Sequence, residues 1–249
     1  MVHVSIQSEH LFEIFGFPVT NTLLTGWIVI ILLCIFAWVI SKRIKEVPDR
    51  FQNAVEAFFE GIFNFMAGFA PNRETAKKFF PLALTIFIFV LSANWIGILP
   101  GVGSIGFTEI HEGGETFVPL FRSVYSDLNM TLALALIVVT LVHIVGVVTI
   151  GLRGHAHKFF NFSSFGNAFA GILELVSEAA KIISFSFRLF GNVFAGEVLL
   201  VIIASLVPYL APVPFLGLEL FVGFIQALIF SVLAMLFLGS ATQSHAEAH

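Results

Sequence analysis

Between residues 174 and 197 the sequence places charged side chains in an otherwise apolar stretch. These charged residues are Glu174, Glu178, Lys181, Arg188 and Glu197, among Ile, Leu, Val, Phe, Ala, Ser and Gly. A charge at mid-membrane depth costs ~2.5 to 3.5 kcal/mol on insertion scales, so such charges usually have a functional reason. At 100° per residue, a helix here carries one polar stripe about 27 Å long. Its members are Glu174, Ser177, Glu178, Lys181, Ser184, Arg188 and Asn192. Glu197 lies off the stripe.

Arg188 is the most informative of these charges, because a guanidinium stays protonated at physiological pH. It has no acidic residue three or four positions away to pair with on its own helix. Opposite a carboxylate on another helix, it would favour the ionised form and repel a proton passing straight across. For Glu178 and Lys181 a second interpretation stays open, an ion pair that only docks helices.

Glu219 and Gln226 lie seven residues apart among Leu, Phe, Val and Ile. On a helix they share one face and are about 10 Å apart along the axis. A glutamate in such surroundings needs a partner or must exchange protons, as a proton relay requires. For Gln226 the alternative is a helix-to-helix hydrogen bond.

The histidines and the single cysteine predict neither a metal site nor a cofactor. His143 lies alone in an apolar run and could titrate near neutral pH, but a lone histidine on an apolar helix is more often simply hydrogen-bonded, which is what we expect here. His155 and His157 resemble half of a metal site without a second half. Cys34 is interpreted as apolar filler. No paired catalytic carboxylates and no Gly-rich phosphate loop occur, so we expect no catalytic residues and no enzyme activity in this chain alone.

Composition requires a membrane protein. Hydrophobic residues make up 58% and charged residues 11% of the 249, and the mean hydropathy is +0.98. These values lie outside the range of soluble domains, so we expect the lipid bilayer to surround the chain. The formal net charge of −4 provides no electrostatic footprint for nucleic acid.

Apolar runs and breakers predict a single all-α membrane domain over 1–249 with about five passes. The expected spans are 22–40, 80–99, 129–150, the polar-striped 167–206 and 215–239, with an amphipathic interfacial helix at 47–70 and an external loop at 101–127. Forty helical residues would extend ~60 Å, twice the hydrocarbon thickness, so 167–206 must be steeply tilted or broken. Pro208, Pro212 and Pro214 predict a tight turn between the last two helices, which form a C-terminal hairpin.

Basic residues orient these passes. Lys42 and Arg43 follow the first span, Lys77 and Lys78 precede the second, and the third returns to basic residues near 153. The positive-inside rule therefore places the N-terminus outside and the C-terminus in the cytoplasm. A bacterial plasma (inner) membrane is preferred, and the mitochondrial inner membrane is the alternative.

One segment resembles a family signature. Residues 184–197, SFSFRLFGNVFAGE, resemble the signature of F-type ATP synthase subunit a. The resemblance extends to 80–82 (FPL), 127–133 (DLNMTLA) and 224–227 (FIQA), and to the order and length of the passes.

The resemblance implies a stator of a proton channel. Its partners would be a rotating ring of c subunits, b-type peripheral stalk subunits and the remaining ATP synthase subunits, which carry the nucleotide chemistry. Arg188 matches the arginine that faces the ring carboxylate. Outer half-channel positions match Asn192, Glu197, Glu219 and Gln226, and inner ones match Ser184, Lys181, Glu174 and Glu178. Glu219 stands where some bacterial members carry His.

Two other function classes are compatible with charged residues inside a membrane. A secondary transporter would place charges at mid-membrane, but it usually needs broken helices in matched halves, which the sequence lacks. A structural membrane subunit without a proton path is the remaining alternative, and it predicts that Arg188 can be replaced without effect on proton flux.

Overall fold

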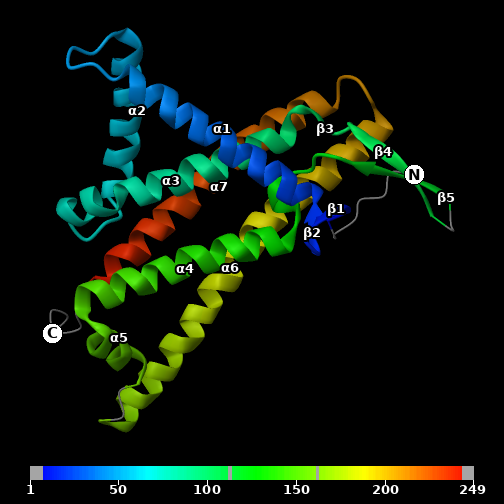
Figure 1. Ribbon diagram of the computed structural model, residues 1–249. Helices are drawn as coiled ribbons and strands as arrows, with labels where there is room; N and C mark the ends of the chain where they lie inside the picture. The colour runs from blue at the N-terminus through cyan, green and yellow to red at the C-terminus, as the bar shows by residue number, and fades with distance from the viewer. Residues whose placement is uncertain (1–7, 112–113, 161–162, 243–249) are drawn as a thin grey trace. The chain divides into compact units, whose positions relative to one another are not determined.

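The computed structural model describes residues 8–111, 114–160 and 163–242 (Figure 1). Helices dominate this part of the chain. They are α1 Asn21–Arg43, α2 Arg50–Ala67, α3 Arg73–Ile98, α4 Leu128–Ile150, α5 Leu152–Phe159, α6 Phe165–Leu206 and α7 Pro212–Ala241. The short strands are β1 His10–Ile14, β2 Phe17–Thr20, β3 Pro100–Gly103, β4 Gly106–His111 and β5 Gly114–Pro119, and a 3₁₀ turn spans Val124–Ser126.

Five helices, α1, α3, α4, α6 and α7, are long and apolar enough to cross a membrane. The all-α membrane architecture with five passes is therefore confirmed. α6 is one continuous helix of 42 residues, about 63 Å long, rather than a broken one. α2 is amphipathic as expected, and its place at the membrane surface stays a prediction. α5 was not predicted, because its eight residues are too few for a clear periodicity.

Prolines mark two boundaries differently from the prediction. Pro212 opens α7 and Pro214 lies in its first turn, so only Pro208 stays outside the helix. The first turn of a helix tolerates proline because its N–H groups have no intrahelical acceptor. α3 begins at Arg73, seven residues before the expected start of the span, and it contains Pro81. Asn72 caps this earlier start by accepting a hydrogen bond from the Thr75 backbone N–H at 2.7 Å.

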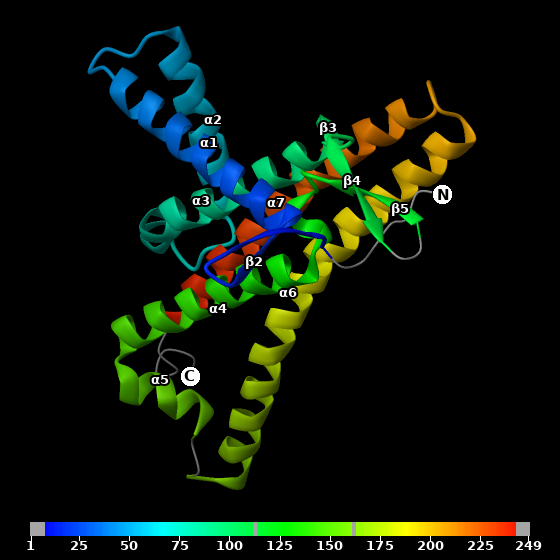
Figure 2. The same cartoon turned by 45° about the vertical axis from the view of Figure 1, so that its right-hand side comes forward.

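Two small antiparallel hairpins were not foreseen. β4 and β5 pair from Gly106↔Pro119 to His111↔Gly114, within the segment expected to be a loop (Figure 1 and Figure 2). β1 and β2 join through Phe15 and Gly16, which have φ angles of 51° and 78°. Two positive φ values define the turn that fits hairpin twist, but Asn-Gly or Asp-Gly is its usual signal. Phe-Gly gave no such signal.

The chain divides into two compact units, the first comprising 1–43, 88–131 and 187–228. Polar contacts hold the first unit together around the start of α1. Asn21 donates to the Pro119 carbonyl at 3.2 Å. Asp127 accepts from Thr22 at 3.2 Å and caps α4 by accepting from the Asn129 N–H at 2.8 Å. These contacts fix the β4–β5 segment and the start of α4 against α1.

The second unit, 44–87, 132–186 and 229–249, packs mainly through apolar side chains. The Phe185 ring of α6 lies 4.5 Å from that of Phe230 and 5.7 Å from that of Phe237, both on α7. A Cβ on Gly239 would lie 2.6 Å from Pro71 Cδ, so glycine permits close approach of α7 to the α2–α3 connection. The two long C-terminal helices are thus packed together in this unit.

Candidate functional site

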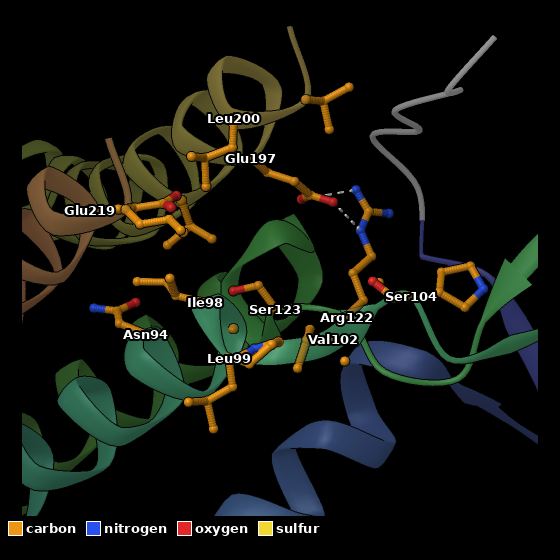
Figure 3. A pocket seen from close by; sticks show the side chains of 18 of the residues that line it. Asn94, Ile98, Leu99, Val102, Ser104, Arg122, Ser123, Glu197, Leu200 and Glu219 are labelled. Carbon is orange, nitrogen blue, oxygen red and sulfur yellow. Dashed lines mark hydrogen bonds and ion pairs between the residues drawn. The ribbon is translucent and has the colours of Figure 1, made fainter. Parts of the chain in front are cut away.

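A cavity of about 770 Å³ lies within the first unit, and we call it the carboxylate cavity (Figure 3). It is bordered by the second half of α6, the first half of α7, the end of α3 and the segment around β3. Its polar lining comprises Glu9, Asn94, Ser104, Arg122, Ser123, Asn192, Glu197 and Glu219. Three residues predicted for one half-channel, Asn192, Glu197 and Glu219, therefore line the same cavity.

Arg122 and Glu197 form an ion pair at this cavity. The guanidinium donates from Nε to Oε1 at 3.2 Å and from Nη2 to Oε2 at 3.4 Å, and Figure 3 shows the two groups facing one another. The Arg122 side chain is 7% exposed and that of Glu197 is 30% exposed. Buried arginine requires such a partner because desolvating an unpaired charge is expensive. The pair fixes the position of the Glu197 carboxylate beside the cavity.

Glu9 completes the charged lining. Burial raises the pKa of the Glu9 carboxyl, the Arg122 guanidinium opposes this shift, and the Glu197 carboxylate adds to it. Among the charged residues that line the cavity, three are carboxylates and one is a guanidinium. A cavity of this composition attracts cations and protons.

Glu219 of α7 packs against the backbone of α6. A Cβ on Gly196 would overlap the Glu219 Oε1 and would lie 2.9 Å from its Cδ, so the absence of a side chain at 196 makes room for this carboxylate. The other oxygen, Oε2, is buried and has no hydrogen-bond partner among the described residues. Buried polar atoms usually find a partner in protein or water, so this oxygen is an unsatisfied acceptor at the cavity.

Hydrogen bonds join α3 and α7, two of the helices that line the cavity. Asn94 donates to the Gly223 carbonyl at 3.1 Å, and Trp95 donates from Nε1 to the Leu220 carbonyl at 3.1 Å. Gln226 is buried in the same unit, but it does not line the cavity. Its Nε2 has no hydrogen-bond partner in the described part of the chain. Its predicted half-channel role is therefore not supported by this cavity and stays a prediction.

The remaining stripe residues lie along α6 as predicted. Arg188 is half-buried in the first unit, while Glu174 is half-buried and Ser184 exposed in the second. Glu178 and Lys181, also in the second unit, form an ion pair at 2.7 Å. Because the two residues are three positions apart on the same helix, this pair does not itself join two helices, and the docking interpretation stays open. Lys181 also lies 4.7 Å from the centre of the Phe237 ring.

A second group of titratable residues, the histidine cluster, is formed by His143 (α4), His155 (α5), Glu178 and Lys181 (α6), all in the second unit. His143 Nδ1 lies 3.1 Å from His155 Nε2, and its Nε2 lies 3.7 Å from Glu178 Oε2. The prediction that His143 is hydrogen-bonded is confirmed. His157 is exposed and outside the cluster.

Over residues 8–111, 114–160 and 163–242, no group of three or more His, Cys, Asp or Glu side chains could hold an ion. The pairing of His155 with His143, rather than with His157, was not predicted, since it depends on the unforeseen α5.

Arg122 and Glu9 were also missed as site residues. The one available signal was that Arg122 is the single basic residue in a segment, 101–127, that otherwise carries acidic charges. Such a charge is equally compatible with an exposed loop, and only the fold brings it to Glu197.

Five helices that are long and apolar enough to cross a membrane define a multi-pass helical membrane protein. The family model for the ATP synthase A chain matches residues 23–239. The chain belongs to this family, whose members are the non-catalytic proton-channel subunit a of F-type ATP synthase.

Relatives in several bacteria agree with this assignment. An ATP synthase subunit a of Gloeobacter violaceus is 35% identical over 234 residues, which cover 92% of this chain and 86% of the relative. That of Geotalea daltonii is 33% identical over 220 residues, covering 88% and 86%. An ATP synthase subunit a 2 of a Bradyrhizobium species is 32% identical over 244 residues, covering 97% of both chains.

Proposed function

We propose that the carboxylate cavity is the outer half-channel of this proton-channel subunit. Asn192, Glu197 and Glu219 line it, and Gln226 would extend the path beyond it along α7. The supporting observation is that α6 and α7 contribute carboxylates to one cavity whose lining carries more acidic than basic groups. A proton entering from outside would pass from this cavity to a carboxylate on the ring of c subunits.

Arg188 separates this path from the inner one. Its permanent positive charge favours the ionised form of a ring carboxylate that comes near it and repels a proton moving directly between the half-channels. The inner half-channel would be formed by Ser184, Lys181, Glu174 and Glu178. A proton then reaches the inside only after the ring has carried it around, which couples flow to rotation.

The partners and membrane follow from the same proposal. The subunit would contact the c ring and b-type peripheral stalk subunits in a bacterial plasma membrane, with the N-terminus outside and the C-terminus in the cytoplasm. Lys42 and Arg43 in the last turn of α1, and His157 and Lys158 in that of α5, support this orientation. Each proton crossing 100 mV releases about 2.3 kcal/mol, so several are required per ATP.

ATP-driven proton pumping in inverted membrane vesicles tests the role of Arg188. Arg188→Gln is expected to abolish pumping while the complex remains assembled. Arg50→Gln is the matched control, because Arg50 is exposed at the start of α2 and belongs neither to the carboxylate cavity nor to the histidine cluster. If Arg188→Gln pumps at the control rate in an assembled complex, Arg188 does not belong to the proton path.

A further inference from the structure

In the histidine cluster, His143 presents each of its two ring nitrogens to a different titratable group. Nδ1 is at hydrogen-bonding distance from His155 Nε2, 3.1 Å, and Nε2 is directed at Glu178 Oε2, 3.7 Å away. An imidazole so placed can take up a proton on one nitrogen and release one from the other. Resting on the proposed function, we propose that His155 and His143 form a proton relay between the inner aqueous phase and Glu178 in the inner half-channel.

The contacts are consistent with one arrangement of hydrogens. In it each neutral ring carries its proton on Nε2, so that His155 donates to His143 Nδ1 and His143 donates toward Glu178. A proton from water binds His155 Nδ1, the Nε2 proton of His155 moves to His143 Nδ1, and the Nε2 proton of His143 moves to the Glu178 carboxylate. One proton enters, one leaves, and both rings end protonated on Nδ1. Each ring must then reorient before the next transfer.

Both ends of the relay have the required surroundings. His155 Nδ1 is buried without a hydrogen-bond partner among the described residues, so a rotation of the ring or a displacement of α5 must admit the water molecule that protonates it. Gly146 of α4 makes space for this ring, since a Cβ at 146 would lie 2.7 Å from Nδ1. At the other end, the 3.7 Å gap exceeds a hydrogen bond by about half an ångström, a distance that a small rotation of Glu178 or one water closes.

Charges from three helices act on the relay. Burial lowers the pKa of His155, and His143 and Lys158 lower it further, whereas Glu178 opposes them. His155 is thus held mainly neutral near pH 7, which lets it accept a proton and pass it on. From α6, Glu178 receives the proton while Lys181 holds the carboxylate at 2.7 Å. α7 contributes the Phe237 ring against Lys181.

The same contacts could serve only to dock α5 on α4. Phe159 packs on both imidazoles, at 6.0 Å from the His143 ring and 5.5 Å from the His155 ring, so the cluster also has an apolar component. A docking role predicts a loss of assembly or stability that does not depend on proton supply. A relay predicts that the loss depends on proton concentration on the inner side and can be bypassed by a small buffer.

The test is ATP-driven pumping by the whole complex in inverted vesicles, in which the medium is the inner phase. We expect His143→Asn and His155→Asn to lower the initial pumping rate about 100-fold or more at pH 8, in the range of general acid–base contributions, and less at pH 6. Imidazole in the medium should restore part of the rate. His157→Asn, an exposed position on the same helix, is the control and should pump normally.

The proposal is overturned by normal pumping of both variants at pH 8, by losses that are equal at all pH values and insensitive to imidazole, or by failure of both variants to assemble. Arg188→Gln is measured in parallel. If it pumps, the proposed function fails; if it does not pump while the histidine variants behave as the control, only the relay fails.

Discussion

Replacing Gly196 by Ala tests whether the position of the Glu219 carboxylate matters for proton transfer. The new Cβ would lie 2.9 Å from Glu219 Cδ, whereas carbon atoms in ordinary contact are about 3.5–4.0 Å apart, so the carboxylate must retreat by about an ångström. Because the displaced group is the end of a flexible side chain, the cost is small. Alanine also gains about 0.5–1 kcal/mol of helix stability over glycine. Net stability should change by less than about 1 kcal/mol.

Activity should respond much more strongly than stability. A misplacement of about 1 Å of a reacting group can lower a rate on the order of 100-fold. We therefore expect Gly196→Ala to reduce ATP-driven pumping about 10- to 100-fold in assembled vesicles. Gly191→Ala is the matched control on the same helix, since a Cβ there meets nothing within 4 Å.

A compensating variant makes the cause specific. Glu219→Asp shortens the side chain by one methylene, so the double variant Gly196→Ala/Glu219→Asp should pump faster than Gly196→Ala alone. Equal pumping by Gly196→Ala and Gly191→Ala would refute the reasoning. So would a loss at 196 accompanied by a large fall in the melting temperature, because the defect would then be one of packing.

Three further predictions concern stability of the purified complex, measured by thermal unfolding. Arg122→Gln should destabilise the complex by about 2 kcal/mol, less than the ~3–5 kcal/mol of a fully buried pair because Glu197 is partly exposed. The double variant Arg122→Gln/Glu197→Gln should recover part of the lost stability, because it leaves no unpaired charge. Strictly additive losses would contradict an interaction between the two side chains. The raised pKa of Glu9 means that the folded state binds the Glu9 proton more tightly than the unfolded state, so ionised Glu9 destabilises the complex above its folded pKa. Glu9→Gln should therefore stabilise the complex at pH 7 and lose this stabilising effect below pH 4.5. An equal gain in stability at both pH values would contradict this reasoning. Gly97→Ala, whose Cβ would lie 2.8 Å from the Ser123 Cβ, should lower the stability of the complex by about 1–3 kcal/mol. The control is Gly217→Ala, where a Cβ meets nothing within 4 Å, and equal stability of the two variants would contradict the prediction.

Sequence patterns were sufficient for the membrane architecture because the bilayer imposes a simple requirement. A span needs about 20 apolar residues with its backbone hydrogen bonds made internally, and both properties are local in sequence. The polar stripe of α6 was predictable for the same reason, since it depends only on helical geometry. Short elements such as α5 and the β1–β2 hairpin were not predictable, because their few residues carry weak periodic and turn signals.

The sequence by itself determined the family, the five spans and the residues worth testing along α6 and α7. Only the tertiary structure decided which of these residues have partners. Arg122 pairs with Glu197 across 75 positions of the chain, and His143 meets both His155 and Glu178. Such contacts depend on how separate helices pack, and packing is set by side-chain shape, by close approaches such as Gly196 to Glu219, and by the need to pair buried charges. None of these is a local property of the sequence.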